Sequence, residues 1–184
     1  MKMMKTISVL FIAFMAMTTL TLADSARELD VDANEALQEF YKEVPGGKKF
    51  LDRAVAYVVF PDVNEAGFFF GGKYGEGPLR VDGKTKSYHS ITGLSAGFHM
   101  GVQNYSLIIA FTSHAALKNF ILDDDDWETD VDSKIIMAEW TSDDDDVDKK
   151  DFGSSMVGFA FDSAGMMAKL SMEGVKFETI YPDD

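Results

Sequence analysis

One motif in the sequence is of the kind that activates a serine nucleophile. Gly93–Gly97 reads Gly-Leu-Ser-Ala-Gly and matches the nucleophile-elbow pattern of serine hydrolases. An elbow places its serine between a strand and a helix, whereas the residues after Ser95 alternate as in a strand. The histidines that follow, His99 and His114, have no acidic residue between them and Ser95, as a hydrolase triad in this order would require. We therefore expect a protein without catalytic activity.

Glycines at positions 71, 72, 75 and 77 have the composition of a phosphate-binding loop. The pattern lacks the Gly-Lys-Ser/Thr ending, and Gly77-Pro78 leads into a strand pattern rather than a helix. No helix N-terminus would then be available for a nucleotide phosphate. A tight turn is the better interpretation, and no cofactor is expected.

Histidines and acidic runs are the remaining candidates for metal binding. The three histidines are isolated, without the paired spacing of imidazole ligands. Asp123–Asp126 and Asp143–Asp146 lack the alternating acids, central glycine and terminal glutamate of a calcium loop. We interpret both runs as solvated loops and expect no metal site, with weak divalent-cation binding as the alternative.

A basic cluster beside two apolar residues is the strongest functional candidate. Lys48, Lys49 and Arg53 flank Phe50 and Leu51. Cations beside a short apolar face suit lipid phosphates and the membrane interface. In the alternative, the two apolar side chains belong to the core and the lysines only keep the surface soluble.

Two helices are predicted around this cluster. Apolar residues at a 3-4-3-4-3 spacing predict an amphipathic helix over Asp32–Val44. Asp32 and Glu35 resemble a capping box at its start, and Pro45-Gly46-Gly47 ends it. The spacing of residues 50, 51, 54 and 55 then predicts a second, short helix.

The rest of the chain is dominated by strand patterns. A buried strand at 57–60 ends at Pro61, and glycine-rich strands follow from 66 to 112, with Asp82-Gly83 as a hairpin turn. A short helix is predicted over 115–121, and further strands over 127–140 and 156–180. The fold class is therefore α+β. The many strand glycines predict a strongly curled or barrel-like antiparallel sheet, with a flat, bulged sheet as the alternative.

Length and composition limit the classes of protein to consider. The 184 residues include 17 basic and 31 acidic residues, with a net charge of −14 and no cysteine. This length suits one globular domain. Disulfides, thiolate metal sites and a cysteine nucleophile are excluded, and the acidic balance argues against nucleic acid as a partner.

The first residues have the pattern of a secretory signal peptide over 1–23. Lys2 and Lys5 precede an apolar run from Ile7 to Met17, which is shorter than a membrane-spanning helix. Cleavage would leave one domain over 24–184, with 15 basic and 31 acidic residues and a net charge of −16. We expect an exported protein, periplasmic or extracellular and peripheral to the membrane. An uncleaved anchor is the alternative.

Several blocks of the chain resemble the SYLF domain family. They are Ala56–Pro61, Ala66–Phe68, Gly71–Gly77, Ile91–Gly97, Gly101–Gln103, Tyr105–Phe111, Phe159-Ala160 and Leu170–Gly174. The family binds membrane lipids, in eukaryotic members phosphoinositides and phosphatidic acid, and fungal members bind actin. The resemblance implies a non-catalytic module for anionic phospholipid headgroups. Actin is not expected as a partner if a bacterium exports the protein.

Seven residues are the predicted lipid contacts. Lys48, Lys49 and Arg53 would meet the phosphate, while Phe50 and Leu51 would insert or line an apolar groove. The predicted secondary contacts are Lys73 and Arg80. The alternative function is a structural or protein-interaction component of the cell envelope that uses its acidic surface.

Overall fold

The computed structural model describes residues 24–67, 70–96, 101–122, 127–128, 135–138, 146–162, 165–166, 170, 172 and 174–184. The predicted signal peptide, the acidic run 123–126 and residues 143–145 lie outside these ranges. The helices are α2 (Ala26–Glu43), α3 (Gly47–Arg53), α4 (His114–Leu122) and the 3-10 turn η1 (Val147–Lys149). The strands are β1 (Ala56–Gly67), β2 (Phe70–Val81), β3 (Lys84–Ala96), β4 (Gly101–Phe111), β5 (Trp127–Glu128), β6 (Ile136–Met137), β7 (Met156–Asp162), β8 (Gly165–Met166) and β9 (Val175–Ile180).

The strands form one mixed sheet, which confirms the α+β class. Its order is β5-β9-β3-β2-β1-β4-β7-β6, with β8 paired to β7. Among the described residues β5 and β6 end this order without pairing to each other, so the sheet is open and the expected strongly curled or barrel-like form is not supported. The pairing of β6 with β7 is parallel, so the expectation of a purely antiparallel sheet was also wrong.

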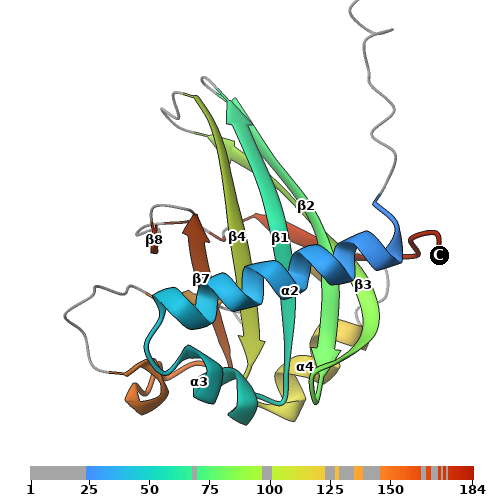
Figure 1. The fold of residues 1–184 in the computed structure, drawn as a ribbon. Coiled ribbons are helices and arrows are strands. Elements are labelled where there is room, and N and C mark those ends of the chain that lie inside the picture. Colours follow the sequence, from blue (N-terminus) through green and yellow to red (C-terminus); the bar gives the residue numbers. More distant parts are fainter. Residues whose placement is uncertain are drawn as a thin grey trace, which may run out of the picture.

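The sheet is covered on both faces. Figure 1 shows α2 crossing one face, with α3 beside it and α4 behind the lower end of the long strands. Alternate residues of each strand point to opposite faces. On β1, Tyr57 and Val59 pack with α2 and α3, whereas Val58 and Phe60 join the core that includes Phe120 of α4. The long strands are therefore apolar on both faces near α3 and α4.

Helix α2 begins earlier than the sequence pattern predicts. Ser25 is its N-cap: the hydroxyl accepts from the Glu28 amide at 3.3 Å, and the Glu28 carboxylate accepts from the Ser25 amide at 3.1 Å. This capping box satisfies donors that the first turn leaves free. The expected box at Asp32 was therefore wrong by two turns, because the buried stripe already includes Leu29.

Strand β1 continues through Pro61, where a strand end was predicted. The register with β4 shifts between Phe60 and Val63, so the proline lies at a bulge, where a strand tolerates the missing N–H. Gly77 faces this bulge from β2. A Cβ at Gly77 would overlap the Val59 carbonyl oxygen and lie 2.7 Å from its carbon, so the close approach requires glycine.

The β2–β3 hairpin confirms one turn prediction and corrects another. Asp82 and Gly83 both have positive φ, 51° and 72°, as a two-residue hairpin turn requires. Residues 71–77, expected to form a tight turn, are instead the interior of β2. Ser95 pairs with Gly71 inside β3, which agrees with rejecting a nucleophile elbow at that position.

Candidate functional site

The basic cluster lies on α3, and its apolar members are buried. Gly46, with φ of 79°, turns the chain from α2 into this short helix. The Phe50 ring makes edge contacts with Phe152 and Phe159, at centroid distances of 5.6 and 5.4 Å. Leu51 belongs to the same core. The predicted insertion of Phe50 and Leu51 into a membrane does not fit this placement, because both side chains hold α3 on the sheet.

The three cations of α3 remain at the surface. The Lys48 ammonium lies 2.7 and 2.9 Å from the two Asp52 carboxylate oxygens, yet the Lys48 side chain is 64% exposed. Arg53 donates a hydrogen bond from Nη2 to the main-chain oxygen of Asp148. Lys49 is exposed. We call Lys48, Lys49 and Arg53 the α3 cation cluster.

The segment that contains η1 brings acids to the same place. The Val147 amide donates to the Pro45 carbonyl at 2.9 Å, which fixes η1 against the start of α3. Val147 is fully buried there, and Asp146 pairs with Lys149 at 3.6 Å. The α3 cation cluster is therefore bordered by Asp52, Asp146 and Asp148, which weaken its attraction for anions.

The Lys73 side chain is buried on the sheet and cannot act as a surface contact in this conformation. Its side chain on β2 is 5% exposed, and Nζ lies 3.6 Å from the Glu65 carboxylate on β1, itself 10% exposed. Tyr105 of β4 donates to the same carboxylate at 3.4 Å. Burial lowers the pKa of Lys73, although the attraction of Glu65 opposes this shift. Burial, reinforced by Glu65, raises the pKa of the Tyr105 hydroxyl.

Arg80 is likewise buried, under α2. Its guanidinium donates to Asn34 Oδ1 at 2.7 Å and to the Asp30 main-chain oxygen at 3.3 Å. Thr85 and Tyr88 of β3 donate to the Asp30 carboxylate at 2.6 and 3.2 Å. This network joins α2 to β2 and β3. Arg80 is thus a structural residue, and its predicted role as a secondary lipid contact does not fit its burial.

The sequence analysis missed a partly buried serine–histidine contact on β3. Ser87 Oγ and His89 Nε2 lie 2.8 Å apart, and the imidazole packs against the Phe120 ring at 4.9 Å between centroids. Burial lowers the pKa of His89 to about 4, so the ring is neutral at pH 7. Among the contacts of the described residues, no carboxylate bonds this ring. The arrangement lacks the orienting acid of a catalytic triad.

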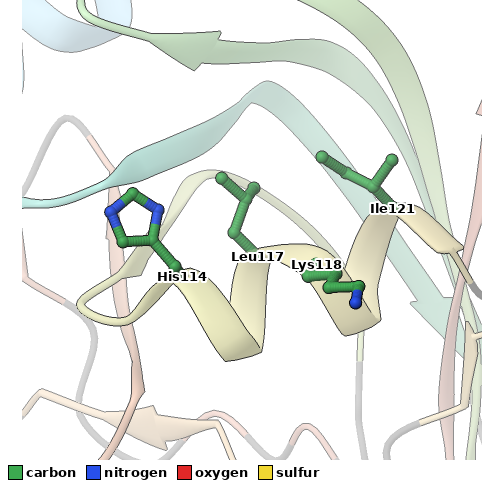
Figure 2. Close-up of a pocket in the computed structure, with 4 residues that line it drawn as sticks. All are labelled: His114, Leu117, Lys118 and Ile121. Atoms are coloured by element: carbon green, nitrogen blue, oxygen red, sulfur yellow. The ribbon is translucent and has the colours of Figure 1, made fainter.

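A groove along α4 was also missed. The described residues that line it are His114, Leu117, Lys118 and Ile121, and its volume is about 410 Å³ (Figure 2). The sequence pattern predicted a short helix over 115–121 without a second apolar face. The structure buries Ala116 and leaves Ile121 43% exposed. The four lining residues are three or four positions apart in the sequence, and this spacing could have predicted that they share one exposed face of α4.

The outward face of α2 is acidic. Glu28, Asp32, Glu35 and Glu39 follow one another at spacings of four, three and four residues. Burial raises the pKa of the Asp32 carboxyl, and nearby carboxylates, Asp24 first among them, add to the shift. Like charges at such spacings destabilise an isolated helix. A partner with cations would relieve this repulsion.

In the described parts of the chain, no group of three or more His, Asp or Glu side chains is placed to hold a metal ion. No described helix is long and apolar enough to cross a membrane. No protein-family model matches the chain, and no curated protein matches it either.

Proposed function

We propose that the protein is an exported, SYLF-like module without catalytic activity that binds anionic phospholipid headgroups at a membrane surface. The α3 cation cluster makes the contact. Phe50 and Leu51 take no part in insertion, because they anchor α3 from beneath. The protein would then be a peripheral, periplasmic or extracellular component.

The observation that carries the proposal is the concentration of exposed cations on one short helix. Lys48, Lys49 and Arg53 are three of the six residues from 48 to 53, in a chain with almost twice as many acids as bases. Burial of the apolar side of α3 fixes the orientation in which these cations face water. Each basic residue near an anionic surface contributes about 1 kcal/mol.

Charge reversal with a matched control tests the proposal. Lys48→Glu/Lys49→Glu changes the charge of α3 by −4, and Lys84→Glu/Lys86→Glu makes the same change beside the β2–β3 turn, where both lysines are exposed. Loss of two attractive contacts alone should weaken co-sedimentation with phosphatidic-acid vesicles by roughly 30-fold in the α3 variant. Far-UV circular dichroism should show that both variants are folded. Equal weakening in the two variants would mean that net charge, rather than α3, sets the binding.

A second function is favoured by the acidic face of α2. Its four carboxylates at helical spacing suit a basic protein partner of the cell envelope. Binding through this face would weaken with salt, require no lipid and decrease in Glu35→Gln/Glu39→Gln. The same double variant should still bind phosphatidic-acid vesicles that contain no other protein. This result would show that the acidic face of α2 and the α3 cation cluster act independently.

A further inference from the structure

Strands β1, β2 and β4 extend well beyond α2 (Figure 1), and a row of polar side chains crosses this part of the sheet. On β1, Asn64 lies opposite Tyr74 of β2 and opposite Asn104 of β4. Thr92 of β3 lies opposite Tyr74 in turn. Directly opposed residues share one face of a sheet, so these side chains form one row over four strands, about 15 Å long, which we call the polar row. Tyr74 is 49% exposed, and Asn64 and Asn104 are exposed as well.

The polar row lies on the face of the sheet that α2 covers elsewhere. Tyr74 and Arg80 are six positions apart on β2, so their side chains point to the same face, and the Arg80 guanidinium bonds α2 through Asn34. Lys73 and its partner Glu65 point to the opposite face, where both are buried. The exposed polar row and the acidic side chains of α2 therefore belong to one continuous surface.

Carboxylates from the sheet and from α2 border the polar row. The Asp62 carboxylate accepts from the Asn104 amide, and the Tyr74 hydroxyl donates to the Glu76 carboxylate. On α2, burial raises the pKa of Asp32, and nearby carboxylates raise it further, namely those of Asp24, Glu35, Glu28 and Asp62. Asp32 and Asp62 thus repel each other across the boundary between helix and sheet.

The negative potential is concentrated over β1, β2 and the adjoining flank of α2. Lys176 of β9 lies opposite Thr92, so the polar row ends at a cation on that side, two strands away from Tyr74. At the other side, Asn64 and Asn104 contribute neutral amides beside Asp62. A cationic partner would therefore be attracted to the end of the row that contains the exposed tyrosine ring.

An exposed tyrosine ring among carboxylates suits a guanidinium better than an ammonium. The planar guanidinium stacks on an aromatic face and donates to a carboxylate in its own plane, whereas an ammonium is a compact and strongly hydrated charge. The amides of Asn64 and Asn104 have the donors and acceptors that a peptide main chain can bond. Ring, carboxylates and amides together match an arginine and the peptide that carries it.

We propose that the polar row and the adjoining flank of α2 bind an extended, arginine-containing segment of a protein partner. One guanidinium stacks on Tyr74, and further cations of the segment face Asp62 and Asp32. Charge complementarity carries this choice of partner, because the exposed ring lies where carboxylates of the sheet and of α2 converge. The inference rests on the second proposed function, a basic partner for α2, and adds the residue type and the sheet surface that would recognise it.

Fluorescence anisotropy of labelled hexa-arginine and hexalysine with the purified full protein, at low salt, tests the surface. Hexa-arginine should bind more tightly than hexalysine, although the two peptides carry the same charge. Tyr74→Leu removes the ring at an exposed position and should weaken hexa-arginine binding about fivefold, with a smaller effect on hexalysine. Asp62→Asn should weaken both peptides about threefold. Asp82→Asn makes the same charge change at the β2–β3 turn, where asparagine tolerates the positive φ, and should leave both affinities nearly unchanged.

The outcomes separate this inference from the function on which it rests. Equal affinity for the two peptides, or hexa-arginine binding that Tyr74→Leu leaves unchanged, overturns the role of the polar row. If Glu35→Gln/Glu39→Gln still weakens binding in that case, the acidic face of α2 keeps its proposed partner without the row. Equal weakening by Asp62→Asn and Asp82→Asn would mean that net charge alone attracts the peptides, which also overturns the inference. Binding of neither peptide at low salt contradicts both the inference and the second function.

Discussion

Replacement of Lys73 by methionine should be among the most destabilising single changes in the sheet. The ammonium and the Glu65 carboxylate lie 3.6 Å apart with 5% and 10% of their side chains exposed. At an effective dielectric constant of ~20, this separation gives an attraction of about 5 kcal/mol. Burial nevertheless lowers the pKa of Lys73, so desolvation offsets part of that attraction. Lys73→Met should therefore cost about 3 kcal/mol, the lower end of the range for breaking a buried pair.

The partner substitution should also be destabilising. Glu65→Gln leaves a buried lysine whose pKa is already lowered by burial, and it removes the carboxylate that accepts from Tyr105. The double variant removes both charges. Its loss of unfolding free energy should be about 2 kcal/mol smaller than the sum of the losses in the two single variants. Urea denaturation followed by far-UV circular dichroism measures all three values.

An exposed pair provides the control for this cycle. Lys48→Met breaks the contact with Asp52, in which both side chains are more than half exposed, and should cost less than about 1 kcal/mol. If Lys73→Met costs no more than Lys48→Met, or if the two buried-site losses are additive within about 0.5 kcal/mol, the buried ion pair does not stabilise the sheet as we have argued.

Three further predictions concern stability. The pKa of His89 is lowered from 6.5 to about 4, so the unfolded chain takes up this proton at a higher pH than the folded chain does. The stabilisation is complete above pH 6.5, and about 3 kcal/mol of it is lost as the pH falls to 4. Urea midpoints should show this loss in the unchanged protein and not in His89→Phe. Gly77→Ala should lower stability by about 3 kcal/mol, because its Cβ would overlap the Val59 carbonyl, whereas Gly72→Ala, with its nearest contact at 3.8 Å, should change the urea midpoint little. Ser25→Ala removes the helix cap and should cost about 1 kcal/mol, measured in the same way; no loss would mean that the capping box is unimportant.

Local patterns were sufficient for much of the fold. The α2 stripe, the Asp82-Gly83 turn and the short helices α3 and α4 follow from periodicity and turn chemistry, which depend on neighbours in the sequence. Pro61 was misjudged as a strand end because the bulge that accommodates it depends on β2 and β4. Whether the sheet closes into a barrel depends on which strands pair at its edges, and the glycine content of the strands does not determine this pairing.

The candidate site was harder to predict, because burial of charged residues is a long-range property. Lys73 shares a face with Gly75 and Gly77, yet its partner Glu65 comes from another strand. Arg80 is buried only because α2 brings Asn34 and Asp30 over the sheet. The α3 lysines lie at the surface, and their contact with a lipid phosphate stays a prediction.

Lipid binding is tested most directly by sedimentation of the purified protein with vesicles of neutral, phosphatidic-acid and phosphatidylglycerol composition, at low and physiological salt. We expect binding to both anionic compositions, weaker at physiological salt, and none to the neutral vesicles. Failure to bind any composition at low salt would contradict the proposed function and would direct the search to protein partners of the acidic α2 face.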